Sequence, residues 1–210
     1  SMGEGLDKIP VTENLSTIVN LKDMKPKKYY YSNLLIKSHL IFSPAPVNTT
    51  TEVNFMEKII VLDFGSQYCQ LIARRIRECH VYSEILPFDT PAEVIAAKNP
   101  QGIILSGGPA SVYAENAPMC DKEIFNLGIP VLGICYGMQL MTHCLGGEVQ
   151  RADKREYGVT EVQINNNSKI FEGFGDVNDF LMSHTDFVAK LPEGFENIGK
   201  TAHCPNAAMQ

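Results

Sequence analysis

The sequence lacks an excess of positive charge, an apolar run long enough to cross a membrane, and cysteines arranged in CxxC pairs. Its net charge of −6 disfavours a protein that holds nucleic acid through phosphate contacts. The N-terminal residues hold several charges and no apolar core, unlike a secretory signal peptide. Six scattered cysteines suit reduced thiols and give no metal signature. We therefore expect a cytoplasmic protein without a membrane span, a metal site or a nucleic-acid partner.

The 210 residues divide into two regions of different composition. Residues 1–55 contain a tyrosine cluster and a Pro/Thr-rich stretch, and they show no alternation of strand and helix patterns. This composition predicts a poorly ordered N-terminal leader or linker, with a short docking or targeting element as the alternative. Residues 56–210 form the expected domain, which is long enough to bury a sizeable core.

Short apolar runs alternate with helical stretches through much of the second region. The pattern predicts strands at 59–62, 81–86, 102–105 and 131–134, and helices at 66–78, 91–98, 121–127 and 138–145. This alternation is typical of an α/β fold with an open, mostly parallel sheet and helices on both faces. Beyond residue 147 the pattern is more β-rich, with strands expected at 161–164, 180–182 and 187–189. In such sheets the site lies at the carboxyl ends of the strands.

Cys135 lies between a buried strand pattern and a helical pattern, with Gly133 and Gly137 on either side. A strand, a tight glycine-flanked turn and a helix make a nucleophile elbow. The free N–H groups and positive dipole end of the helix point at the cysteine, so we expect this setting to favour the thiolate. Cys135 is therefore the predicted nucleophile, and a buried structural cysteine is the alternative.

Two neighbouring features could serve a nucleophile at Cys135. The glycine pair Gly107-Gly108 follows a predicted strand and can present N–H groups to an oxyanion, together with the N–H of Tyr136. An ordinary tight turn is the alternative interpretation. Gln139 lies one helical turn beyond Cys135, where its amide could bind a polar substrate or simply face solvent.

The nucleophile also needs a base, for which His184 has the most suggestive spacing. Asp186 follows two residues later, and residues two apart share a face of a strand. His143 lies two helical turns from Cys135, which is too far to take its proton. An ordinary surface or loop position remains the alternative for His184.

Several long motifs occur in an order that resembles a known family. They occupy residues 62–68 (LDFGSQY), 70–78 (QLIARRIRE), 106–113 (SGGPASVY), 133–139 (GICYGMQ) and 182–186 (MSHTD). Together they are similar to class I glutamine amidotransferases, and among these to the glutaminase domains of the GMP synthetase (glutamine-hydrolysing) family. The resemblance runs from about residue 58 to the end of the chain and implies a flavodoxin-like fold.

The resemblance implies that Cys135 attacks the side-chain amide of glutamine, releases ammonia and forms a glutamyl thioester that is then hydrolysed. It assigns the oxyanion hole to the N–H groups of Gly108 and Tyr136. The residues expected to hold glutamine are Gly107, Gln139, Ser183, His184 and Thr185. This domain needs no cofactor of its own. The implied partner is an ATP-pyrophosphatase (synthetase) domain that uses ATP and Mg²⁺ to convert XMP to GMP, and a homodimer of the full-length enzyme is compatible with the family.

One family motif is absent. The resemblance implies that the catalytic base and its orienting acid come from a His-Pro-Glu motif, and no His-Pro-Glu occurs in these 210 residues. We therefore expect a glutaminase domain that is truncated at its C-terminus, lacks the triad His and Glu, and uses His184 as a pocket residue rather than a base. Two alternatives remain: a glutaminase subunit of another synthase, such as anthranilate synthase, and a non-catalytic interaction module with the same fold.

Overall fold

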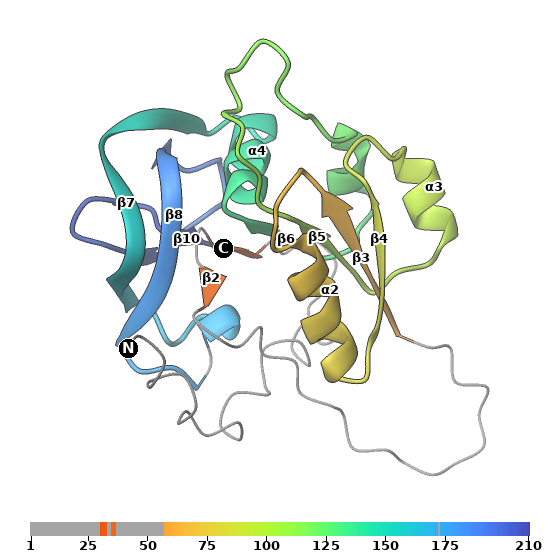
Figure 1. The fold of residues 1–210 in the computed structure, drawn as a ribbon, viewed down its shortest axis with the longest axis horizontal. Helices are drawn as coiled ribbons and strands as arrows, with labels where there is room; N and C mark the ends of the chain where they lie inside the picture. The colour runs from red at the N-terminus through yellow and green to blue at the C-terminus, as the bar shows by residue number, and fades with distance from the viewer. Residues whose placement is uncertain (1–29, 33–34, 37–56, 172) are drawn as a thin grey trace, which may run out of the picture.

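The computed structural model describes residues 30–32, 35–36, 57–171 and 173–210 (Figure 1). These residues form one mixed sheet in the order β2-β8-β7-β9-β10-β1-β6-β5-β3-β4. The parallel half contains β3 (Lys58–Asp63), β4 (Tyr82–Pro87), β5 (Gly102–Leu105) and β6 (Val131–Ile134). The four predicted parallel strands are therefore confirmed, with bounds that differ by at most one residue.

Helices cover both faces of this half, as predicted, because alternate residues of β3 are buried on opposite sides. Ile59 and Val61 pack in a core cluster with the apolar face of α2 (Cys69–Glu78). Ile60 and Leu62 pack in the other cluster, with α3 (Ala92–Ala97), η1 (Lys122–Asn126) and α4 (Tyr136–Cys144). Figure 1 shows α2 and α4 beside the parallel strands.

Two helix predictions need correction. The helix predicted to begin at residue 66 begins at Cys69, because the hydroxyl of Ser66 accepts the N–H of Tyr68 at 3.1 Å and holds residues 66–68 in a turn. The helix predicted at 121–127 is the 3₁₀ helix η1. Asp121 caps it by accepting the N–H of Glu123 at 3.0 Å, while its other carboxylate oxygen accepts the N–H of Ala92 at 2.9 Å and ties η1 to α3.

The other half of the sheet is antiparallel. It contains the long strands β7 (Glu148–Ile164) and β8 (Val177–Lys190) and the short strands β9 (Asn197–Lys200) and β10 (Ala208–Met209), with η2 (Lys169–Phe171) between β7 and β8. The strand predicted at 161–164 is only the end of β7. The separate strands predicted at 180–182 and 187–189 are wrong, because polar residues 183–186 interrupt the apolar pattern while backbone pairing with β7 continues.

Two short strands lie within residues 1–55, where the sequence predicted none. β1 (Tyr30–Ser32) pairs with both β6 and β10, and β2 (Leu35–Ile36) pairs with β8. The rest of this region and Met56 lie outside the described residues, so the leader interpretation and the boundary at residue 56 remain predictions. No helix among the described residues is long and apolar enough to cross a membrane.

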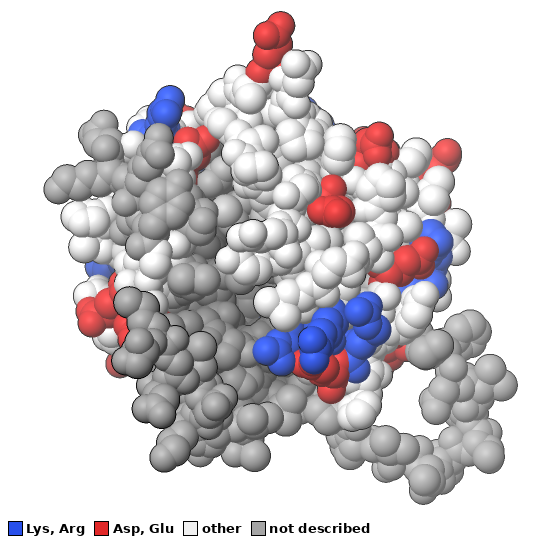
Figure 2. All heavy atoms as spheres, in the orientation of Figure 1, with Lys and Arg blue, Asp and Glu red and all other residues white. Residues whose placement is uncertain are grey.

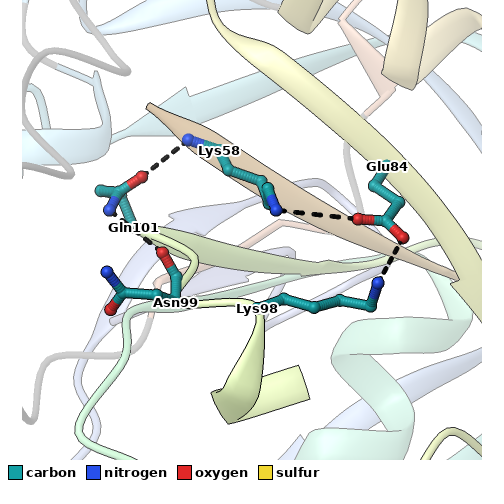
Figure 3. Close-up of polar contacts among 5 residues, drawn as sticks. All are labelled: Lys58, Glu84, Lys98, Asn99 and Gln101. Carbon is teal, nitrogen blue, oxygen red and sulfur yellow. Dashed lines mark hydrogen bonds and ion pairs between the residues drawn. The ribbon is translucent and has the colours of Figure 1, made fainter. Parts of the chain in front are cut away.

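Polar contacts join the amino ends of the parallel strands, opposite the edge expected to hold the site (Figure 3). The backbone N–H of Lys58 donates to the side chain of Gln101 at 2.6 Å, which ties the start of β3 to the residue before β5. The carboxylate of Glu84 on β4 binds Lys98 at 2.7 Å and lies 4.0 Å from the ammonium of Lys58. These contacts fix the strand register away from the site, whose residues gather at the carboxyl ends.

The charged surface is uneven. Arg74 and Arg75 on α2 are exposed and form ion pairs with Glu78 at 2.9 and 2.6 Å. Figure 2 shows the basic cluster over this helix, with acidic atoms in its midst, while the rest of the described face carries scattered acidic groups and fewer basic ones. Exposed helix pairs of this kind contribute about 0.5 kcal/mol or less each to stability. The single carboxylate of Glu78 offsets one of the two arginine charges, so the cluster stays basic.

Candidate active site

Cys135 occupies the sharp turn between β6 and α4. Its backbone has φ of 52° and ψ of −111°, an uncommon conformation for a residue with a side chain. The N–H groups of Met138 and Gln139 donate to its carbonyl oxygen at 3.0 and 3.1 Å, so the helix starts directly behind it. The predicted strand–turn–helix geometry is present, and the role of Cys135 as a nucleophile remains a prediction.

The elbow depends on two glycines because the strand end, the helix and β5 approach closely. A Cβ atom at Gly133 would lie 2.7 Å from the carbonyl carbon of Gly137. A Cβ atom at Gly137 would overlap the carbonyl oxygen of Leu105. These neighbours are backbone atoms, which cannot turn aside as a flexible side chain can. Glycine at both positions thus permits the turn that presents Cys135.

The glycine turn after β5 faces Cys135. A Cβ atom at Gly107 would lie 3.5 Å from the Cβ of Cys135 and 3.6 Å from the hydroxyl of Ser66. A Cβ atom at Gly108 would lie 2.5 Å from the carbonyl oxygen of Phe64. The structure therefore brings the Gly107-Gly108 turn and Cys135 together. This was expected, because both follow the carboxyl ends of neighbouring parallel strands. The roles of the two glycines in binding glutamine and an oxyanion remain predictions.

Ser106 fixes the orientation of this turn. Its fully buried hydroxyl accepts the N–H of Phe64 and donates to the carbonyl of Gly107, both at 3.0 Å. Because the peptide bond is trans and planar, holding the Gly107 carbonyl also holds the Gly108 N–H in the opposite direction. Sequence reasoning did not assign this role to Ser106, although the serine stands in the same motif as the two glycines.

Tyr136 places its backbone and its ring in different environments. Its N–H hydrogen-bonds the sulfur of Cys135, and its role as an oxyanion-hole donor remains a prediction. Its buried phenol donates to the carbonyl of Pro118 at 2.7 Å, and its ring packs on Phe64 with 5.5 Å between centroids. Burial raises the pKa of this phenol to about 12. Tyr136 therefore anchors α4 while its N–H faces the nucleophile.

The expectation that the elbow favours the thiolate of Cys135 is wrong in its net direction. Burial raises the pKa of the Cys135 thiol above its ordinary value. The N–H of Tyr136 opposes this shift, as the helix argument predicted, but it is outweighed. The carboxylate of Asp186 adds to the rise because it repels a second negative charge. Sequence reasoning could not assess burial of the thiol or its distance from Asp186.

The antiparallel half supplies the other side of the site through β8. Gln139 is buried, and its side-chain N–H donates to the backbone carbonyl of Asp186 at 3.0 Å, so the solvent-facing alternative is wrong. The hydroxyl of Thr185 donates to the Asp186 carboxylate at 3.4 Å. Ser183 and His184 lie on the same strand, where their backbones pair with residues 157 and 156. The substrate-binding roles of Gln139 and residues 183–185 remain predictions.

This geometry agrees with a family-level comparison. Residues 60–210 match the family model described as "Glutamine amidotransferase class-I". The chain belongs to the class I glutamine amidotransferase family. The fold, with its mostly parallel sheet flanked by helices and its β-rich C-terminal part, is therefore the one that the sequence resemblance implied.

Individual relatives narrow the comparison. A protein of Caldicellulosiruptor saccharolyticus named GMP synthase [glutamine-hydrolyzing] is 59% identical over 153 residues, covering 73% of this chain and 30% of the relative. A protein of the same name from Clostridium botulinum is 57% identical over 152 residues, covering 72% of this chain and 30% of the relative. The chain thus spans about 30% of the length of these curated relatives.

Solved structures give the same fold. A putative GMP synthase subunit from Thermoplasma acidophilum has a TM-score of 0.62 and 25% identity, covering 75% of this chain and 79% of that one. A glutamine amidotransferase from Thermotoga maritima has a TM-score of 0.56 and 21% identity, covering 75% and 72%. The second likeness shows the fold alone.

The structure contains a groove at the same edge of the sheet as Cys135. It has a volume of about 800 Å³ and lies beyond the carboxyl ends of β3 and β4. Its lining residues are Asp63, Phe64, Gly65, Phe88, Glu115, Asn116, Ala117 and Pro118. Cys135 does not line it, although Phe64 lies against both this groove and Gly108. Within the described residues, no three His, Cys, Asp or Glu side chains gather as a metal site would require.

Proposed function

We propose that this chain is the glutaminase domain of a GMP synthase and hydrolyses the side-chain amide of glutamine through a thioester on Cys135. The observation that carries the proposal is the positive φ of Cys135 in the turn between β6 and α4, beside the glycine turn. A Cβ atom added at Gly107 would lie 3.5 Å from the Cβ of Cys135. The names of the curated relatives favour a GMP synthase over an anthranilate-type synthase as the enzyme to which this glutaminase belongs.

The geometry suits attack on an amide carbon. The sulfur of Cys135 bonds to the carbon, and the amide oxygen takes the negative charge facing the N–H groups of Gly108 and Tyr136. The carbon–nitrogen bond then breaks, ammonia leaves with an added proton, and water hydrolyses the thioester to glutamate. Because burial keeps the thiol protonated in the free chain, a base must remove its proton first.

The base is the catalytic group of this mechanism to which we assign no residue of the chain. The His-Pro-Glu motif that supplies it in the family does not occur in these residues. Members of a catalytic triad act as a unit, so loss of the base removes most of the turnover while leaving a nucleophile that reacts with strong electrophiles. We therefore expect this chain to be labelled at Cys135 more readily than it turns over glutamine.

The released ammonia would serve a synthetase partner. The chain spans about 30% of relatives named GMP synthase, which supports the proposal that the amination of XMP with ATP and Mg²⁺ is carried out by a separate synthetase part. An ATP-pyrophosphatase domain or subunit is the proposed partner, and glutamine is the proposed substrate of this chain.

The test is covalent labelling with a chloroketone analogue of glutamine, followed by peptide mapping. We expect one label per chain on Cys135, slowed by glutamine and not by asparagine, and lost in Cys135→Ala. Iodoacetamide on the same protein controls for general thiol reactivity. Exclusive labelling of other cysteines, or no protection by glutamine, would contradict the proposal and favour a non-catalytic module.

Ammonia release from glutamine completes the test, with Cys135→Ala as the blank. Labelling without turnover is the expected result and agrees with a missing base. Clear turnover that is lost in the blank would place a working base within this chain. His184 with Asp186 would then be the first pair to replace.

A further inference from the structure

Gly107 differs from the other glycines of the candidate site, because packing does not exclude a side chain there. A Cβ atom at Gly108, Gly133 or Gly137 would overlap backbone atoms of neighbouring segments. A Cβ atom at Gly107 would meet nothing nearer than 3.5 Å, an ordinary van der Waals separation, and Gly107 is not among the glycines with positive φ. Gly107 therefore leaves open a space that a methyl group would fill without disturbing the fold.

The space over Gly107 lies between Cys135 and Ser66. A Cβ atom at Gly107 would lie 3.5 Å from the Cβ of Cys135, 3.6 Å from the hydroxyl oxygen of Ser66 and 3.7 Å from the carbonyl oxygen of Ile134. Ser66 is half-buried and belongs to the turn between β3 and α2. The hydroxyl of Ser66 and the side chain of Cys135 thus flank the same small space from two different loops.

The turn that carries Ser66 is held by short-range hydrogen bonds. The Ser66 hydroxyl accepts the N–H of Tyr68 and its carbonyl accepts the N–H of Cys69, both at 3.1 Å. Just before it, the N–H of Gly65 donates to the carboxylate of Asp63 at 2.9 Å. A serine hydroxyl has two lone pairs and one proton. Within the described part of the chain it makes no other hydrogen bond, so one lone pair and the proton remain for a ligand.

Resting on the proposed function, we propose that Ser66 is a specificity-determining residue whose hydroxyl accepts a hydrogen bond from the side-chain NH₂ group of glutamine. A reacting carbon lies about 3–3.5 Å from the attacking atom, so the amide group itself, and not the distant α-carboxylate, reaches the space beside Cys135. In the proposed mechanism the amide oxygen faces the N–H groups of Gly108 and Tyr136. The nitrogen is therefore the amide atom left to face Ser66, and an amide nitrogen donates hydrogen bonds.

This contact selects amides over esters. An ester places an oxygen where glutamine has its NH₂ group, and that oxygen has no proton to donate to Ser66. The carbonyl group and the amino-acid end of the ligand are unchanged in glutamate γ-methyl ester. A comparison of glutamine with this ester therefore isolates the hydrogen bond that the amide nitrogen makes.

The test measures how well each ligand protects Cys135 of the whole chain from iodoacetamide, which requires binding and no turnover. Initial rates are compared, and the intact mass is checked for an acyl-enzyme. Glutamine should protect the unaltered chain at lower concentration than the ester. Ser66→Ala should weaken protection by glutamine about fivefold, the loss of one neutral hydrogen bond, and leave protection by the ester nearly unchanged. Ser66→Thr, which keeps the hydroxyl, should restore the preference for glutamine.

Two further variants separate ligand binding from structure. The hydroxyl of Ser111 accepts the N–H of Tyr113 at 3.5 Å, two residues on, as Ser66 does with Tyr68. Ser111→Ala therefore removes a comparable turn hydrogen bond and should change protection by neither ligand. Gly107→Ala should unfold in urea like the unaltered chain but bind both ligands more weakly, because its methyl group occupies the space.

The outcomes distinguish this inference from the proposed function beneath it. If Ser66→Ala weakened both ligands equally or neither, while glutamine still protected the unaltered chain, the proposed function would stand and the role of Ser66 would be overturned. Undiminished binding of both ligands to Gly107→Ala would likewise overturn it, since the space would then be empty in the complex. No protection of the unaltered chain by glutamine would overturn the proposed function and this inference together.

Discussion

The two ends of α4 hold cysteines in opposite chemical settings. Helix electrostatics alone would favour the thiolate of Cys135 at the N-terminal end and disfavour that of Cys144 at the C-terminal end. The structure shows the reverse, with the pKa of Cys135 raised and that of Cys144 lowered. Burial dominates at Cys135, whereas the Cys120 thiol and Lys122 dominate at Cys144. Immediate contacts therefore outweigh the helix dipole at both ends.

The backbone at the two ends differs as well. At the N-terminal end Gly137 touches the backbone of Leu105, with no room for a side chain. At the C-terminal end Gly146 has φ of 87° and no atom within 4 Å of an added Cβ. There the N–H of Gly147 donates to the carbonyl of Thr142 at 2.8 Å, which is the closing hydrogen bond of a Schellman motif. One glycine is required by packing and the other by conformation.

Replacing these glycines by alanine should give the largest effect and separate the two requirements. Gly137→Ala forces α4 away from β5, and overpacking against backbone should cost about 3 kcal/mol of unfolding free energy. Gly146→Ala meets no atoms, and its positive φ should cost only about 1 kcal/mol. Urea unfolding of both variants and the unaltered chain measures the difference. A loss in Gly137→Ala no larger than the loss of about 1 kcal/mol expected for Gly146→Ala would show that packing at Gly137 is looser than its contacts indicate.

A smaller effect is expected from Ser106→Ala, which frees the turn facing the N-terminal end of α4. The variant leaves the buried N–H of Phe64 without its acceptor and should lose about 1–3 kcal/mol of stability. It should also slow labelling of Cys135 by the glutamine chloroketone, because the Gly107–Gly108 peptide is no longer held. Labelling by iodoacetamide, which needs no oxyanion donor, should change little.

Ser168→Ala is the matched control for Ser106→Ala. Ser168 is also buried, with 2% exposure, but its hydroxyl has no hydrogen-bond partner. Removing that hydroxyl should leave stability unchanged or slightly higher, and labelling of Cys135 unaffected. Equal losses in the two variants would show that the Ser106 hydrogen bonds do not stabilise the turn.

The sequence predicted the parallel half well because its signals are local. Short apolar runs marked β3 to β6, and the glycines around Cys135 marked the elbow. The antiparallel half was harder because β7 and β8 are defined by pairing with each other, which continues through the polar residues 183–186. β1 and β2 gave no local signal, since each is only a few residues long and is defined by distant partners.

The site was predictable in its parts but not in its electrostatics. Motif order placed Cys135 and the glycine turn at one sheet edge, because parallel strands end together. The raised pKa of Cys135 depends on burial and on Asp186, which is 51 residues away in sequence. Burial and electrostatic interactions between distant residues can be assessed only from the three-dimensional fold, whereas motifs can be recognised in the sequence.

Asp186→Asn should give the smallest effect and test the electrostatic side of the comparison. Only the thiolate reacts with iodoacetamide, so the reaction at Cys135 should still be accelerating above pH 9.0, its ordinary pKa, while that at Cys144 levels off at lower pH. Removing the negative charge of Asp186 should lower the pKa of Cys135 and move its profile to lower pH. Asp186 is the last of three causes of the shift, so the gain in rate below pH 9 should be under about tenfold, the equivalent of one pKa unit. The backbone carbonyl that holds Gln139 is unchanged, and the Cys144 profile serves as the internal control. If both profiles moved together, or neither moved, the charge of Asp186 would not be what distinguishes the N-terminal end of α4.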